Sequence, residues 1–173
     1  MEAEIDYVGL VRGMDDDRKQ AEQYLLNYAF ELLEYERRKH DDLYGSPWDD
    51  EKVGGKSNLP GKPTEAQAIK SADYDEQSPV YWWLKAVETA MRTFGERKHI
   101  FIAVRREAER QGNYREGQPG RRAWVVYTQR RYAEEIQKRF INAHGWMGER
   151  TVKAWWSQIL DTIVEIHLRI KKN

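Results

Sequence analysis

Apolar side chains recur at helical spacing along residues 149–171, and no other feature of the sequence restricts the fold as strongly. The residues on this face are Val152, Trp155, Trp156, Ile159, Leu160, Ile163, Val164, His167 and Ile170. This spacing is typical of an amphipathic helix that buries one face. Such a helix needs other apolar helices to cover that face. The segment therefore predicts a helical bundle rather than an isolated helix.

Most of the remaining chain also predicts helices. Helical spacing and capping signals mark the segments 16–40, 79–94, 96–110 and 128–144, and a further short helix begins near Thr64. The segment 123–127 fits either a short strand or the start of a helix, and its pattern does not decide between them.

Two segments predict loops, because glycine, proline and polar residues replace the apolar spacing there. They are residues 41–62 and residues 111–121, and the first is longer than most loops in packed domains. The expected fold class is therefore mainly α: a helical bundle with one long loop and a C-terminal helix-turn-helix.

Charge divides the chain in two, although the net charge is zero. Residues 1–79 carry 19 acidic and 10 basic side chains, and residues 80–173 carry 10 acidic and 19 basic ones. Twelve of the 15 basic residues between Arg92 and Lys153 are arginines, which pair with phosphate oxygens and guanine edges. The excess of basic residues in the C-terminal half of the chain favours a nucleic-acid partner. The alternative interpretation is a solvated helical surface with internal ion pairs.

We accordingly expect two regions. Residues 1–78 form an acidic N-terminal helical interaction region that contains the loop 41–62. Residues 79–173 form a basic, DNA-binding helical domain.

The sequence offers few residues for catalysis or metal binding. It contains no cysteine, which excludes disulfides, thiolate metal sites and a cysteine nucleophile. No two of its four histidines lie within four residues of each other, so no local metal-ligand pair exists. The string Val53-Gly54-Gly55-Lys56-Ser57 lacks the first glycine of a phosphate-binding loop. We therefore expect no enzymatic activity, no metal and no cofactor.

The N-terminal segment is acidic and lacks the basic start and apolar stretch of a signal peptide. No apolar run approaches the roughly 20 residues that cross a bilayer. We expect a cytoplasmic protein without a membrane partner.

The C-terminal region contains a candidate helix-turn-helix. Residues 132–136 are typical of a supporting helix, residues 145–148 supply a glycine-rich turn, and residues 149–156 begin the recognition helix. Two packed helices joined by glycine are the alternative interpretation. The candidate DNA contacts are Arg130, Arg131, Arg150, Thr151, Lys153 and Gln158. The first two would contact phosphates from the supporting helix, and the others would reach bases or phosphates from the recognition helix.

Several short strings follow one another along the chain. They are Tyr44-x-x-Pro47, Val53-Gly54-Gly55-Lys56-Ser57, Pro63-Thr64-Glu65-x-x-Ala68-Ile69, Tyr81-Trp82 and Glu149-Arg150-Thr151-Val152-Lys153. This order resembles phage late-gene transcriptional activators of the RinA/ArpU type. The last string is similar to the start of the recognition helix in the fourth region of sigma factors. The resemblance implies a sequence-specific DNA-binding activator of late genes that acts in the cytoplasm of a bacterial host cell.

The expected main partner is double-stranded DNA. The acidic N-terminal region would pair with a second copy of the chain, as a homo-oligomer, or touch the host RNA polymerase. Three other functions stay open: a small terminase subunit that recognises phage DNA for packaging, a non-enzymatic helical scaffold or adaptor, and an RNA-binding antiterminator.

DNA binding by the basic half should depend strongly on salt. Each phosphate contact contributes about −0.9 to the slope of log affinity against log salt concentration, so several contacts give a slope of roughly −4 or steeper. Fluorescence anisotropy of a labelled duplex between about 50 and 200 mM salt measures this slope. A flat titration would contradict a phosphate-contacting surface.

Overall fold

The computed structural model describes residues 7–45, 65–110, 120–140 and 143–171. Within these ranges the chain forms seven helices and no strand, which confirms the mainly α fold class. The helices are α1 (Tyr7–Leu26), α2 (Tyr28–Tyr44), α3 (Glu65–Gln77), α4 (Pro79–Thr93), α5 (Glu96–Arg110), α6 (Gly120–Arg139) and α7 (Glu149–Ile170).

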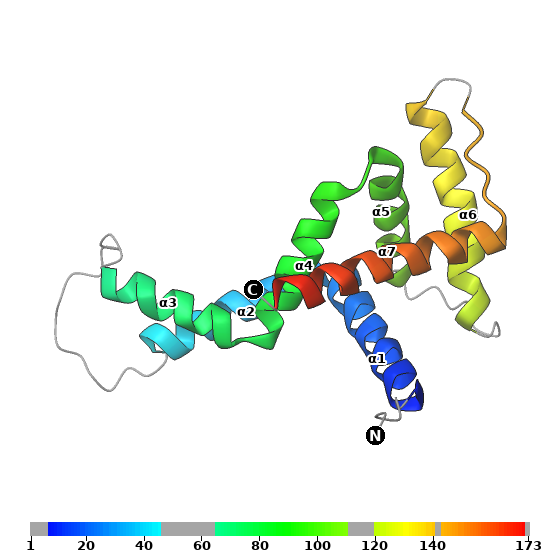
Figure 1. The fold of residues 1–173 in the computed structure, drawn as a ribbon. Helices are drawn as coiled ribbons and strands as arrows, with labels where there is room; N and C mark the ends of the chain where they lie inside the picture. The colour runs from blue at the N-terminus through cyan, green and yellow to red at the C-terminus, as the bar shows by residue number, and fades with distance from the viewer. Residues whose placement is uncertain (1–6, 46–64, 111–119, 141–142, 172–173) are drawn as a thin grey trace.

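The helices form an elongated molecule with a projecting end (Figure 1). Helix α7 runs from α6, past α5, to α4, and α1 approaches it from one side. Helices α5 and α6 lie side by side. Helices α2 and α3 pack on each other and on α4, and they extend away from the other helices. We call α2 and α3 the arm, and the other five helices the body.

The hydrophobic core lies in the body and takes side chains from all five of its helices. Its fully buried members include Leu25 from α1, Val87 from α4, Phe101 from α5, Ile136 from α6 and Ile159 from α7. Apolar packing is therefore continuous across the expected boundary between residues 78 and 79. The expected division into an acidic region and a basic region at this boundary stays a prediction.

Helix α7 has the bounds and the buried face that its apolar spacing predicts. Val152, Ile159 and Ile163 are fully buried on it. His167 is buried on the same face and stacks on the Trp83 ring of α4, with ring centroids 3.7 Å apart. Burial lowers the pKa of this imidazole, so the neutral ring is the form that packs.

Helical spacing predicts one helix over residues 16–40, and this prediction is wrong at Asn27. The Asn27 backbone has φ −104° and ψ 19°, which separates α1 from α2. The Asn27 N–H donates to the Gln23 carbonyl, and the Glu31 N–H donates to the Asn27 carbonyl, both at 3.0 Å. These bonds keep the helical register across the break. The apolar spacing therefore continues through it, and the sequence pattern does not reveal it.

The composition predicts that the long loop begins at residue 41, and this start is wrong because residues 41–44 belong to α2. Gly45 ends the helix with φ 83°, a left-handed conformation that favours glycine. Its N–H donates to the Asp41 carbonyl at 2.9 Å. The rest of the predicted loop, from residue 46, lies outside the described residues.

Helix α6 begins and ends earlier than the predicted helical segment 128–144. The helix begins at Gly120, so the ambiguous segment 123–127 is helical and the loop predicted over 111–121 ends earlier; residues 111–119 lie outside the described ranges. The helix ends at Arg139 rather than at residue 144. No glycine or proline stands at this end, so the sequence carries no signal for it.

None of the described helices combines the length and the apolar character that a membrane span requires.

Trp156 should be worth more to stability than its neighbour Trp155. Trp156 is buried, whereas Trp155 is half-buried, because adjacent helical residues point about 100° apart. Trp156→Ala should lower the free energy of unfolding by about 3–5 kcal/mol, and Trp155→Ala by less. Urea unfolding of both variants measures the difference, and equal losses would contradict this packing of α7.

Candidate nucleic-acid interface

The segment between α6 and α7 is anchored on α6. A Cβ built on Gly145 would lie 2.7 Å from the Ala133 Cα and 2.8 Å from the Ile136 Cβ, so this glycine permits a close approach that a larger residue would prevent. The Gln129 side chain donates to the Met147 carbonyl at 2.7 Å, and Met147 is buried. These contacts fix the point from which α7 starts.

The outer face of the first turns of α7 is exposed and basic. Arg150, Thr151 and Gln158 all lie in solvent, opposite the buried Val152. No carboxylate occurs between residues 150 and 158. Arg150 forms no ion pair with any part of the chain that the structure describes. The start of this helix therefore presents a cation, polar side chains and the positive end of the helix dipole.

Lys153 is also exposed, but it lies on the flank of this face. Its Nζ is 2.5 Å from Glu149 Oε1, one helical turn earlier. A lysine held in this way can still exchange its carboxylate partner for a phosphate, because an exposed pair of this kind contributes only about 0.2–1 kcal/mol. Lys153 stays a predicted contact.

Two exposed residues flank the anchored segment. Arg130 follows Gln129 on α6 and forms no ion pair with a described residue. Trp146 precedes Met147, and 69 % of its surface is exposed. The hydrogen bond from the Gln129 side chain to the Met147 carbonyl joins the chain neighbours of Arg130 and Trp146. The sequence pattern does not reveal the exposure of Trp146, because a glycine-rich segment has no periodic signal. An aromatic residue that lies outside any apolar face is the one hint in the sequence.

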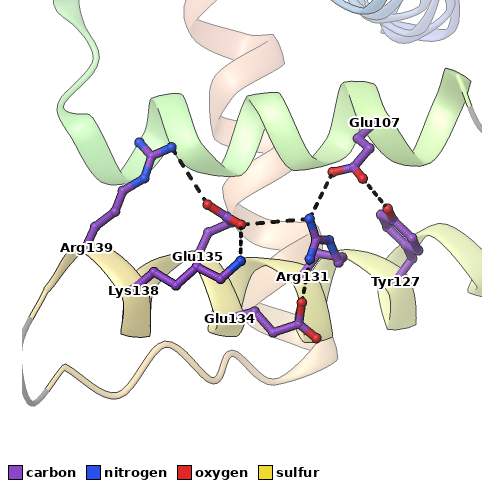
Figure 2. Close-up of polar contacts among 7 residues, drawn as sticks. All are labelled: Glu107, Tyr127, Arg131, Glu134, Glu135, Lys138 and Arg139. Atoms are coloured by element: carbon purple, nitrogen blue, oxygen red, sulfur yellow. Dashed lines mark hydrogen bonds and ion pairs between the residues drawn. The ribbon is translucent and has the colours of Figure 1, made fainter.

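Arg131, in contrast, is enclosed by carboxylates (Figure 2). Its guanidinium lies 2.6 Å from Glu134, 3.8 Å from Glu107 on α5 and 3.8 Å from Glu135. The hydrogen bond to Glu134, with Glu107 nearby, raises the pKa of Arg131. The structure thus separates the two arginines that the sequence treats alike. Arg130 faces solvent, and Arg131 joins α6 to α5; a phosphate contact by Arg131 stays a prediction.

Arg105 shows that another part of the positive charge is structural. This guanidinium is buried and pairs with Glu109 at 2.8 Å and with Glu22 of α1 at 3.3 Å. It also lies over the rings of Trp124 and Trp156. Arg105 cannot contact a polyanion from this position, so the count of arginines in the sequence overstates the accessible charge.

The helix-turn-helix stays a prediction. Helices α6 and α7 are adjacent in the order that the motif requires. The connection between them spans residues 140–148, whereas a helix-turn-helix turn usually has about three or four residues.

Among the described residues, no cluster of histidine or acidic side chains could hold a metal ion. No family model, no curated protein and no solved structure matches the chain.

Substitution of Gly145 should disturb the start of α7. Gly145→Ala would force a methyl group against the α6 backbone and should lower the free energy of unfolding by about 1–3 kcal/mol. Gly13→Ala is the matched control, since nothing lies within 4 Å of its Cβ position and it stands inside α1; alanine there should stabilise slightly, by up to about 1 kcal/mol. Thermal unfolding compares the two, and a neutral Gly145→Ala would contradict the close approach.

Proposed function

We propose that this chain binds double-stranded DNA sequence-specifically through the N-terminal half of α7, and that it acts without enzymatic activity as a transcriptional activator of phage late genes. The observation that carries the DNA-binding part is the outer face of α7 from residue 150 to residue 158, which is exposed, basic and free of carboxylates. The regulatory part rests on the resemblance described above.

An α-helix fits the major groove of B-DNA, and the residues at its N-terminal end reach the base edges. Arg150 can pair with the O6 and N7 atoms of a guanine, and Gln158 can pair with an adenine. Thr151 lies between them, where its hydroxyl reaches a base or a phosphate. Arg130, on the neighbouring helix, supports this contact as a phosphate ligand. The exposed indole of Trp146 lies beside the same helix start and offers an apolar contact to a sugar.

The C-terminal half of α7 limits how far this contact extends. Asp161 lies on the exposed side and pairs with Arg18 of α1 at 2.6 Å, and Glu165 pairs with Arg169. These carboxylates repel phosphates, so only the first turns of α7 suit a DNA surface. So short a reading surface recognises few base pairs, and DNA-binding proteins of this kind commonly act as dimers that read two half-sites.

The arm supplies a surface for such pairing. Helix α2 packs Tyr35 against α3 and α4, but its opposite face exposes Phe30 and Leu33 at 65 % and 70 % of their surfaces. Tyr44 is exposed about three turns after Leu33 on the same face. Large apolar side chains grouped on one face are typical of an interaction site. We assign a second copy of the chain to this face, in preference to the host polymerase.

Loss of the cation at position 150 should weaken and broaden DNA recognition. Arg150→Ala should cost about 1–3 kcal/mol of binding free energy to a preferred site and relax specificity at one base pair. Arg130→Ala should weaken all sequences about equally and make the salt slope shallower by about one. Arg169→Ala, an exposed and paired arginine at the other end of α7, is the control and should change neither.

Gel-shift assays with late-promoter DNA, random DNA and RNA measure these effects on folded variants. If Arg150→Ala lowers the affinity for specific and random DNA equally, Arg150 does not read a base. Preference for RNA would support an antiterminator, and a ring detected by light scattering would support a small terminase subunit. If the chain binds no nucleic acid at low salt, a helical scaffold or adaptor becomes the favoured function.

A further inference from the structure

A groove on the side of α5 that faces away from α7 has no role in the proposed DNA contact. Two adjoining hollows of about 440 and 530 Å³ meet at Met91, His99 and Arg106. The first lies between α2, α4 and α5, and the second lies between α5 and α6. Phe101 points from α5 in another direction, toward Trp155 and Trp156 of α7. The groove and the reading face of α7 are therefore separate surfaces.

Arg106 is the central polar group of this groove. Its side chain is half-buried, and its Nε donates to the Leu25 carbonyl at 2.8 Å, near the end of α1. This bond orients the guanidinium. In the described part of the chain no carboxylate pairs with Arg106, and its two Nη nitrogens form no hydrogen bond. Burial and the neighbouring cation of Arg110 lower the pKa of Arg106. A half-buried cation beside a second cation lacks its counter-charge.

The other charged groups of the groove are already paired. Arg92 is held by Glu88 at the edge of the first hollow. Arg131 and Arg139 lie on the α6 wall near Glu135, which also binds Lys138 at 3.0 Å. Positive charge without a partner is thus concentrated at Arg106 and Arg110 on α5. Arg110 lies one helical turn after Arg106 on the same face, so both guanidinium groups can reach one anion.

The walls beside these arginines are apolar. Tyr28, Val87 and Met91 line the first hollow, and Ala103 and Val104 line the second. Hollows of this volume suit a small organic molecule. Two arginines next to a tyrosine ring and aliphatic side chains match a ligand with a phosphate at one end and a flat, poorly hydrated group at the other.

We propose that this groove binds the phosphate group of a nucleotide through Arg106 and Arg110, with the base covering the half-buried side chains of Tyr28 and Met91. The guanidinium groups donate paired hydrogen bonds to the phosphate oxygens, and the bound anion supplies the missing counter-charge. The phosphate comes either from a free mononucleotide or from the end of a single strand, because both present the same chemistry.

Isothermal titration calorimetry of the full chain with AMP and with inorganic phosphate tests this site. AMP should bind at one site and more tightly than phosphate, since only AMP covers the apolar wall. Arg110→Gln should weaken AMP binding by about tenfold or more, because it removes a charge-assisted hydrogen bond. Arg106→Gln should have the same effect. Arg92→Gln is the matched control, since this arginine also lines the groove but is paired with Glu88.

Arg110 is exposed, so its variant keeps the test valid if Arg106→Gln destabilises the fold. Arg150→Ala should leave AMP binding unchanged, which separates this site from the proposed DNA contact. Competition by a short 5′-phosphorylated single strand shows whether a strand end also enters the groove. AMP affinity that is unchanged in both glutamine variants, or no saturable binding of either AMP or the single strand, would overturn the proposal.

Discussion

The body of this protein depends on one buried cation. Arg105 lies in the core between α1, α5, α6 and α7, and a guanidinium there loses its hydration at considerable cost. Glu22 and Glu109 supply the counter-charge, and the Arg105 Cζ lies 4.7 Å and 5.2 Å from the centroids of the Trp124 and Trp156 rings. The Trp156 indole also donates to Glu22 at 3.1 Å. Because each partner comes from a different helix or turn, this cluster holds the helices in one mutual arrangement.

Ion pairing determines how much of the basic half remains available to a partner. Arg105 and Arg131 are bound by carboxylates of neighbouring helices, and Arg92, Lys153 and Arg169 are bound within their own helices. Most arginines without carboxylate partners among the described residues fall into two places: Arg130 and Arg150 beside the start of α7, and Arg106 and Arg110 in the groove of α5. The other is Arg97, at the start of α5, which lies over the Phe140 ring. The two proposals, for DNA and for a nucleotide phosphate, follow this division.

The body and the arm use helix surfaces differently. In the body, each helix turns apolar side chains toward the common core, and single apolar residues such as Val126 and Leu168 stay exposed. In the arm, α2 has a polar network with α3, in which Tyr35 and Lys39 both bind Asp75, and it leaves an apolar face in solvent. A helix pair that is joined by polar contacts and exposes phenylalanine and leucine lacks one layer of packing. A second copy of the chain would complete it.

The sequence alone determined the helical class, the bounds of α5 and α7, the buried position of His167 and the exposure of Arg150, because all of these depend on apolar spacing within one segment. It did not reveal the break at Asn27, since the helical register continues through it, or the end of α6, which no glycine or proline marks. Nor did it separate Arg130 from Arg131, or identify Arg105 as buried and Arg106 as unpaired. Only the tertiary structure decided these, because the partner of a charged side chain is set by which helices pack together, and that information is not contained in the spacing along any one of them.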